Sequence, residues 1–188
     1  WAMEHTNAPA DIMVFGKALT NALNPLSGIW AGEELISPDT FGPGSTHSTF
    51  SSNSLGTATG LAVMQAFEDG NYEKTVPEKG AYFLELLKDL QKKHKEIGDV
   101  DGLGLALRME MCEADAYTPS RRLADAMFQK GLDGELTYAG KKMGLILDIG
   151  GYYKNVITLA PSLEITTREM DMAHDLLDQL LTLCKKDL

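Results

Sequence analysis

Residues 9–17 read Pro-Ala-Asp-Ile-Met-Val-Phe-Gly-Lys, and this stretch decides how the chain is interpreted. The apolar run at 12–15 is short and has turn residues on both sides, which predicts a buried strand. Lys17 then stands where that strand ends. About thirty residues later, residues 46–53 read Thr-His-Ser-Thr-Phe-Ser-Ser-Asn. Hydroxyl groups and backbone N–H groups in such a small, polar stretch are suited to hold a phosphate.

A lysine at the end of a buried strand, with a phosphate cradle nearby, is the arrangement expected of an enzyme that uses pyridoxal phosphate. Such an enzyme needs an amine that can lose its proton and form a Schiff base, and burial of a lysine makes that loss easier. The cofactor's phosphate needs donors to hold it. The two stretches therefore predict a pyridoxal 5'-phosphate site.

Five further segments extend the pattern, and together with Lys17 they resemble the class III aminotransferases, which are pyridoxal-phosphate enzymes of fold type I. The matching segments occur in the family's order along essentially the whole chain. They read Trp-Ala-Met-Glu-His at 1–5, Pro-Leu-Ser-Gly at 25–28, Ser-Thr-Phe-Ser-Ser-Asn-Ser-Leu at 48–55, Asp-Gly-Leu-Gly-Leu at 101–105 and Ala-Pro-Ser-Leu-Glu-Ile-Thr at 160–166.

The resemblance implies a role for three side chains. Lys17 is implied as the Schiff-base lysine, which also moves a proton during the reaction. Thr49 is implied to bind the cofactor phosphate of a neighbouring subunit, and Ser48 is a second, weaker donor. A homodimer with shared sites follows from that role of Thr49. Because the family's other cofactor-holding residues lie upstream of Trp1, we expect the chain to be the C-terminal portion of a longer enzyme.

The fold class expected is α/β, with the C-terminal part of the large pyridoxal-phosphate domain at 1–72 and a smaller α+β C-terminal domain at 73–188. Thr166 and Glu169 form a capping box that starts the last helix. That helix is expected to bury Met170, Ala173, Leu177, Leu180, Leu181 and Cys184. Asn53 is expected either to brace the phosphate loop or to start the helix after it. The other expected elements are strands at 12–15, 26–31, 103–111, 144–148 and 156–160, a loop at 37–53, and helices at 54–68, 75–96 and 119–130.

The composition excludes some classes of partner. The formal net charge is −10 and no long basic cluster occurs, which argues against a nucleic acid or an anionic membrane surface as partner. No apolar run approaches the length of about 20 residues that a membrane span requires. Cys112 and Cys184 lie in apolar patterns without metal-ligand spacing, so we expect no metal site and two buried, reduced thiols in a cytoplasmic protein.

Departures from the family pattern bear on the substrate. Many members that use α-amino acids carry an arginine that grips the substrate carboxylate, and Thr158 stands at the aligned position. Another family arginine is replaced by Asp101, while Arg108 and Arg168 are expected at the surface. We therefore expect an amine donor and an aldehyde or ketone acceptor, at least one of which lacks an α-carboxylate held from this half of the enzyme.

Three functions remain open at this stage. The first is transamination. The second is an aminomutase or an amino-acid epimerase of the same fold, which would use the same lysine without consuming a keto substrate. The third is a non-catalytic relic or dimerisation domain, which would form no Schiff base. The presence of Lys17 disfavours the third reading.

Overall fold

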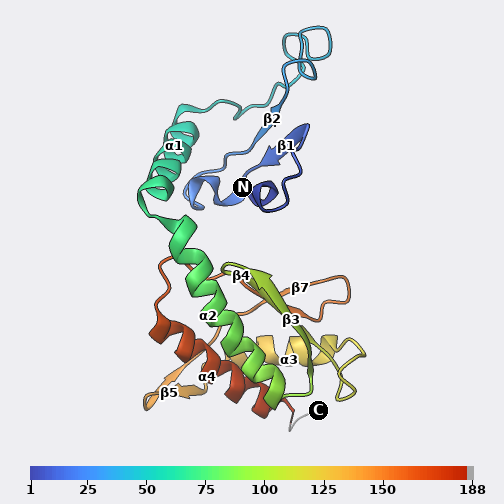
Figure 1. Cartoon of the computed structure of the whole chain (residues 1–188), viewed down its shortest axis with the longest axis vertical. Coiled ribbons are helices and arrows are strands. Elements are labelled where there is room, and N and C mark those ends of the chain that lie inside the picture. The colour runs from blue at the N-terminus through green and yellow to red at the C-terminus, as the bar shows by residue number, and fades with distance from the viewer. Residues whose placement is uncertain (186–188) are drawn as a thin grey trace. The chain divides into compact units, whose positions relative to one another are not determined.

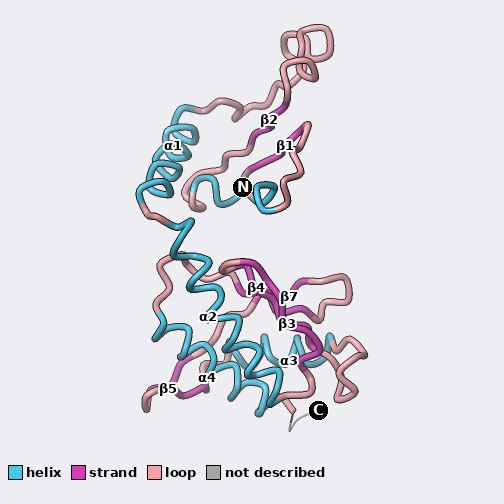
Figure 2. Tube along the Cα trace, in the orientation of Figure 1, coloured by secondary structure: helices cyan, strands magenta, loops and turns pink. Residues whose placement is uncertain are grey.

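The computed structural model describes residues 1–185 and divides the chain into two compact units (Figure 1). Unit 1 comprises Trp1–Asn71, and unit 2 begins at Tyr72. Both units mix helices with antiparallel strands (Figure 2). The division lies one residue before the change in composition from which a domain boundary was expected.

Unit 1 is built on a two-stranded antiparallel sheet and one long helix. Its elements are the 3₁₀ helix η1 (Ala2–His5), strand β1 (Ile12–Phe15), the 3₁₀ helix η2 (Lys17–Thr20), strand β2 (Gly28–Ala31) and helix α1 (Ser54–Asp69). Residues 32–53 form no helix or strand. The predicted strand at 12–15, loop at 37–53 and helix at 54–68 are thus confirmed. The second strand is two residues shorter than expected, since Leu26 packs against Gly60 of α1 instead.

The expected burial of β1 is wrong for the described chain. Ile12 and Val14 are 56% and 74% exposed. The physical reason is that β1 pairs only with β2 among the described strands, and a two-stranded sheet leaves much of its apolar surface uncovered. The side chain of Lys17 is exposed as well, so burial does not act on its amine here.

Helix α1 begins where the sequence indicates. The side chain of Asn53 accepts a hydrogen bond from the backbone N–H of Gly56 at 2.7 Å, which satisfies one of the free donors of the first turn. Starting the helix, one of the two roles expected for Asn53, is therefore confirmed. The Asn53 amide also donates to the Phe50 carbonyl at 3.2 Å, so the side chain braces the preceding loop as well. Gly56 and Gly60 are buried, because they lie on the small-residue side of the helix.

Unit 2 packs three helices and a four-stranded sheet around the apolar core of the chain. The helices are α2 (Tyr72–Lys93), α3 (Arg121–Leu132) and α4 (Thr167–Cys184). The antiparallel sheet has the order β3 (Ile97–Leu103), β4 (Ala106–Met111), β8 (Val156–Leu159) and β7 (Asp148–Gly150), and β5 (Leu136–Tyr138) pairs with β6 (Lys141–Met143) in a separate hairpin.

Neighbouring rows of register partners across the sheet differ in character: one is apolar and the next is polar. One row joins the register partners Val100, Met109, Ile157 and Ile149, which belong to the core cluster or pack against it. The next row joins Asp101, Arg108, Thr158 and Asp148. Because successive side chains of a strand point to opposite faces, this polar row lies on the face away from the core.

The predicted strand at 103–111 is only partly correct. Strand β4 covers its second half, while Leu103 ends a separate strand, β3, and is exposed. The sequence conceals β3 because Gly98, Asp99, Asp101 and Gly102 are residues that strands rarely contain. Pairing with β4 overrides that weak propensity.

Gly131 does not stop helix α3, contrary to the expectation of a helix ending at residue 130. The helix runs through Gly131, where a Cβ atom would lie 2.2 Å from the carbonyl oxygen of Leu145. The Leu145 N–H donates to the Gly131 carbonyl at 2.9 Å. The glycine thus permits a close backbone approach. That approach also explains why 144–147 forms no strand and why β7 begins only at Asp148.

The remaining differences concern the ends of elements. Helix α2 was expected at 75–96 and begins three residues earlier; the last strand ends at Leu159 rather than at residue 160. The Thr166–Glu169 capping box is present as predicted. The α4 core prediction is confirmed except for Ala173, which is only partly buried. Both cysteines are buried, and neither forms a disulfide.

Candidate active site

Lys17 is the first residue of η2 and follows β1 after a single glycine. Its backbone φ is 51°, in the left-handed region that non-glycine residues seldom adopt. Such a conformation costs on the order of 1–3 kcal/mol and often marks a functional site. Lys154 has the same type of backbone, with a φ of 56°, so the conformation alone does not single out Lys17.

The segment after Lys17 is fixed to helix α1. Thr20 is fully buried, and its hydroxyl donates to the carbonyl oxygen of Asn24. The Asn24 amide in turn donates to the hydroxyl of Thr59 on α1 at 3.0 Å. These contacts hold the turn that carries Lys17 in place, so that its side chain starts from a defined point of the fold.

A hollow lies beside Lys17. It is lined by Lys17, Ala18 and residues 21–27, and its polar members include Asn21, Asn24 and Ser27. A primary amine beside amide and hydroxyl groups is a donor set suited to an aldehyde cofactor with polar substituents. The residues present therefore fit pyridoxal phosphate in their chemistry.

Ser48 and Thr49 lie exposed in the loop between β2 and α1. The Ser48 carbonyl accepts hydrogen bonds from the N–H of Ser51 at 3.1 Å and from its hydroxyl at 2.9 Å. The side chains of Ser48 and Thr49 are both exposed at this local turn.

Lys17 and the start of the loop that carries Thr49 attach to different ends of the β1–β2 ladder. Phe15 pairs with Gly28 and Ile12 pairs with Ala31, so Lys17 lies beyond the Gly28 end of the ladder. The loop of residues 32–53 leaves from the Ala31 end, extends beyond β2 and returns to the start of α1 (Figure 1). The lining of the hollow beside Lys17 includes neither Ser48 nor Thr49 of the same chain.

In unit 2, Thr158 has charged neighbours in its polar row. Arg108 pairs in register with Thr158 on one side, and Asp148 does so on the other. The Arg108 guanidinium lies 2.9 Å from Asp99 and 3.4 Å from Asp101. The expectation that Arg108 lies on the polar face of its strand is confirmed, and its charge is already matched by two carboxylates.

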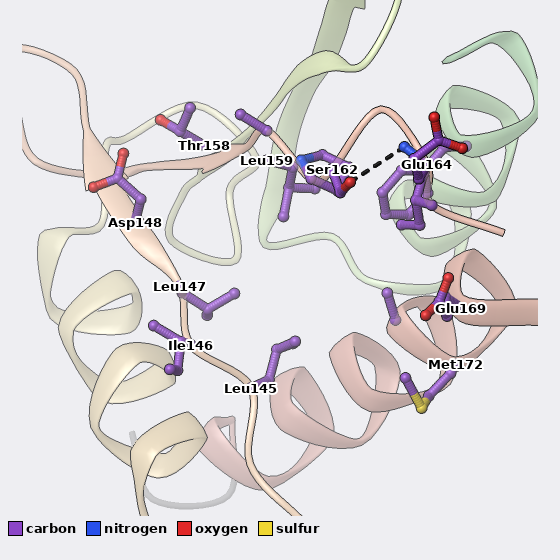
Figure 3. A pocket seen from close by; sticks show the side chains of 15 residues that line it. Leu145, Ile146, Leu147, Asp148, Thr158, Leu159, Ser162, Glu164, Glu169 and Met172 are labelled. Atoms are coloured by element: carbon purple, nitrogen blue, oxygen red, sulfur yellow. Dashed lines mark hydrogen bonds between the residues drawn. The ribbon is translucent and has the colours of Figure 1, made fainter. Parts of the chain in front are cut away.

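A largely apolar hollow in unit 2 was not expected from the sequence (Figure 3). Asp148 and Thr158 lie at one side of it, and Glu164 and Glu169 lie at the other. The remaining lining residues that Figure 3 labels are Leu145, Ile146, Leu147, Leu159, Ser162 and Met172. Its residues come from β7, β8, α4 and the segments between them, which only the tertiary fold brings together.

The two glutamates of this hollow are engaged in structural contacts. Glu164 accepts a hydrogen bond from the Tyr72 hydroxyl, which raises the pKa of Tyr72. Glu169 accepts bonds from the backbone and the hydroxyl of Thr166, and these bonds lower the pKa of Glu169. Both carboxylates thus make contacts within the fold of unit 2.

None of the helices that the structure describes is long and apolar enough to cross a membrane.

Comparison with known proteins identifies the family. The model of the aminotransferase class-III family matches residues 1–181. An ornithine aminotransferase from Exiguobacterium sp. is 31% identical over 96% of this chain and 39% of its own length. An acetylornithine aminotransferase from Caldanaerobacter subterraneus is 34% identical over 95% of this chain and 40% of its own length. The chain thus spans about 40% of the length of these relatives.

Solved structures show the same fold. A transaminase from the marine bacterium Virgibacillus superposes with a TM-score of 0.86 at 19% identity, over 100% of this chain and 42% of that one. An acetylornithine aminotransferase from Elizabethkingia anophelis gives a TM-score of 0.77 at 23% identity, over 96% of this chain and 43% of that one. The expected fold class, a mixed α/β part of a fold type I transaminase, is confirmed.

Proposed function

This chain belongs to the class III aminotransferase family, whose members use pyridoxal 5'-phosphate, and we propose that it carries part of the active site of an aminotransferase. The reaction would move an amino group between an amine donor and an aldehyde or ketone acceptor. The observation that carries this proposal is Lys17, which follows β1 after a single glycine within a family match covering residues 1–181. Residues 1–72 would belong to the large cofactor-binding domain, and residues 73–188 would form the small C-terminal domain.

The cofactor, when bound, withdraws electrons from the substrate carbon that carries the amine. Lys17 would tether the cofactor through its Nζ atom. Once released from the cofactor, the same amine would take a proton from the substrate carbon that carries the amino group. It would then deliver that proton to another carbon atom, which is general acid–base catalysis. The fixed turn from Thr20 to Asn24 supports this role, because a proton carrier must start from a defined position.

Thr49 and Ser48 would hold the cofactor phosphate of a second subunit. The hollow beside Lys17 includes neither Ser48 nor Thr49 of the same chain, which supports service to another chain. A homodimer with two shared sites follows, and we propose this assembly for the protein.

Hybrid dimers test the shared site. A dimer that combines one Lys17→Ala subunit with one Thr49→Ala subunit would contain one intact site, if Thr49 serves the partner. We expect the hybrid to show about half of the wild-type activity per dimer. If Thr49 serves its own chain, the hybrid will have no more than half of the activity of the Thr49→Ala homodimer, and the shared site is wrong.

For the substrate, we propose that at least one partner in the reaction lacks an α-carboxylate held from this half of the enzyme. Thr158 cannot form the bidentate grip of an arginine. Its register neighbour Arg108 is paired with Asp99 and Asp101, which supports the absence of a free guanidinium in that row. Two relatives are named for ornithine and acetylornithine, and another, from Arabidopsis thaliana, is named for alanine and glyoxylate.

A reaction assay separates the alternatives. The complete gene product, supplied with pyridoxal phosphate, an amine donor and a carbonyl acceptor, should consume the acceptor and form its amine in a one-to-one ratio. An aminomutase or epimerase would instead isomerise an amino acid without consuming an acceptor. A relic would do neither. We also propose a cytoplasmic location, because both cysteines are buried and neither forms a disulfide.

A further inference from the structure

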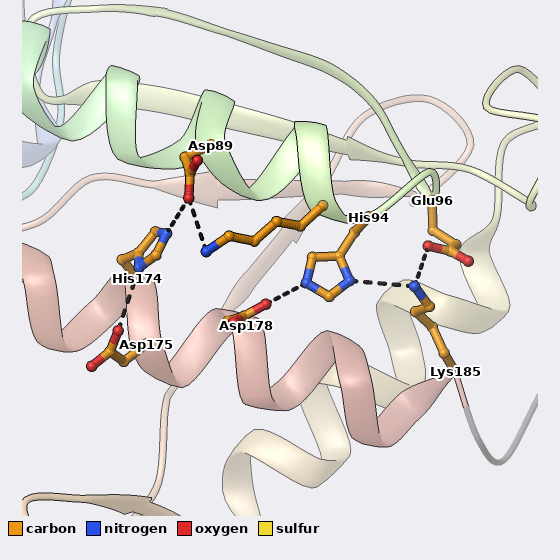
Figure 4. A network of polar contacts seen from close by, with 8 residues as sticks. Asp89, His94, Glu96, His174, Asp175, Asp178 and Lys185 are labelled. Carbon is orange, nitrogen blue, oxygen red and sulfur yellow. Dashed lines mark hydrogen bonds and ion pairs between the residues drawn. The ribbon is translucent and has the colours of Figure 1, made fainter.

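Helices α2 and α4 meet along a seam that contains two histidines (Figure 4). His94, which directly follows α2, is only 5% exposed. Its Nε2 atom lies 2.5 Å from Oδ1 of Asp178, and its Nδ1 atom lies 3.3 Å from Nζ of Lys185. Lys185 directly follows α4 and also forms an ion pair with Glu96 at 2.9 Å. The His94 ring thus lies between the carboxylate of Asp178 and the ammonium group of Lys185.

The two neighbours determine which form of the His94 ring fits. A lysine ammonium group can only donate hydrogen bonds, so the Nδ1 atom that faces Lys185 must accept one. A carboxylate only accepts, so the Nε2 atom that faces Asp178 must carry a proton. The neutral ring with its proton on Nε2 satisfies both contacts, whereas an imidazolium ring would place an N–H group against the ammonium group.

His174 on α4 has the opposite surroundings. Its Nε2 atom lies 3.3 Å from Asp89 and its Nδ1 atom lies 3.5 Å from Asp175. Both ring nitrogens of His174 face carboxylates, which accept hydrogen bonds. The hydrogen bond from Lys93, reinforced by His174, lowers the pKa of Asp89 and keeps it a carboxylate. The two histidines of one seam thus differ in the groups that they face: a carboxylate and an ammonium group at His94, two carboxylates at His174.

We propose that His94, Lys185 and Glu96 form a pH-sensitive latch on the C-terminal end of α4. In the latched state, neutral His94 accepts from Lys185, which is held against Glu96. When the ring gains a proton, its Nδ1–H faces the ammonium group of Lys185, and the repulsion releases Lys185. The charged groups around the ring are Asp178 and Lys185 from the α4 side, and Glu96 from the segment after α2. Lys93, the residue before His94, pairs with Asp89 instead.

Glu96 is the anionic partner of Lys185 in the latched state. Burial raises the pKa of Glu96, but the hydrogen bond from Lys185, a backbone hydrogen bond and the charges of Lys185 and His94 together lower it. A carboxyl whose folded-state pKa is lowered contributes stability above its unfolded pKa and loses it as the pH falls through the folded one. Glu96 therefore stays a carboxylate that can hold Lys185.

The test is ring ¹⁵N NMR of the complete gene product between about pH 5 and 8, the range in which histidines titrate. His→Gln variants assign the four histidines of the chain. The latch requires His94 to be in the neutral Nε2–H form at neutral pH. An imidazolium at His94 at neutral pH would overturn the proposal.

Two variants give a second readout. Lys185→Met should move the His94 titration midpoint to higher pH, because a positive neighbour has been removed. Lys185→Met should also speed backbone amide hydrogen exchange in the last turn of α4 by about tenfold at neutral pH. The wild type should show the same increase in opening of that turn only after acidification. Lys88→Met is the matched control, since Lys88 on α2 pairs with Glu85 instead of a histidine. The latch is refuted if Lys185→Met behaves like this control.

Discussion

Units 1 and 2 differ in what they bury, and the difference locates the candidate chemistry. Among the described residues, every buried apolar side chain of the core belongs to unit 2, from Phe83 to Cys184. Unit 1, by contrast, exposes Trp1, Ile12, Val14, Ile29, Trp30, Phe50, Leu55 and Leu61. Surfaces of this kind mark contacts with other protein. Lys17 therefore lies on the unit whose large apolar side chains are exposed, and not on the unit that has its own apolar core.

The largest expected effect concerns the lysine itself. Lys17→Ala should reduce the transamination rate of the complete gene product by a factor of about a thousand or more, because the proton-transferring amine is lost. Lys154→Ala is the matched control, since both lysines are exposed and have left-handed backbone conformations. Rates measured at saturating cofactor decide the matter. If the two variants lose transamination rate equally, Lys17 has no special role in the reaction.

The second prediction compares two leucines. Leu87 of α2 is fully buried, whereas Leu61 of α1 is 73% exposed. In the 188-residue chain, Leu87→Ala should lower the free energy of unfolding of unit 2 by about 2–5 kcal/mol through lost burial and the resulting cavity. Leu61→Ala should change the free energy of unfolding of unit 1 by less than about 0.5 kcal/mol, because little apolar surface is lost from contact. Urea unfolding measures both. A large cost at Leu61 would show that unit 1 has a core of its own.

A third prediction uses two glycines. Gly131→Ala places a Cβ atom 2.2 Å from the Leu145 carbonyl oxygen and should destabilise unit 2 by about 1–3 kcal/mol, as overpacking does. At Gly42 in unit 1, the nearest atom to such a Cβ is 3.6 Å away, so Gly42→Ala should be nearly neutral. Thermal unfolding of the two variants checks this contrast, and equal shifts would contradict it.

These comparisons also show how far the sequence can be interpreted. Lys17 after its strand, the Asn53 cap and the Thr166–Glu169 box were predictable, because each depends on residues within a few positions of one another. Strand β3 and the close approach at Gly131 were not, since both arise from partners distant in sequence. The exposure of β1 was missed for a related reason: an apolar run predicts burial, but the covering surface is not part of the run.

The candidate site divides in the same way. Lys17, Ser48 and Thr49 could be proposed from local motifs and a family resemblance. Which residues surround Lys17 depends on the folded chain: the hollow beside it is lined by residues between 17 and 27, without Ser48 or Thr49. The pairing of Arg108 with Asp99 and Asp101 likewise needs the β3–β4 register. Motifs therefore identify residues, and tertiary structure shows which of them can act together.

The smallest effect expected is a change in acid stability. Hydrogen bonds from the backbone and hydroxyl of Thr166 lower the pKa of Glu169. The stability that Glu169 contributes is therefore present above its unfolded pKa and declines as the pH falls through its folded pKa. Glu169→Gln keeps a capping side chain without a titrating group, so acid unfolding of unit 2 should become slightly less steep. Glu68→Gln on α1 makes the same charge change in unit 1 and should leave that transition unaltered.

The central claim is that Lys17, on the unit without its own core, carries the cofactor. The most direct measurement is reduction with borohydride after pyridoxal phosphate has been added to the complete gene product, followed by intact-mass and peptide-mass analysis. One cofactor adduct per chain, mapped to Lys17, is the predicted result. An adduct at another lysine, or no adduct on the complete protein, would contradict the claim.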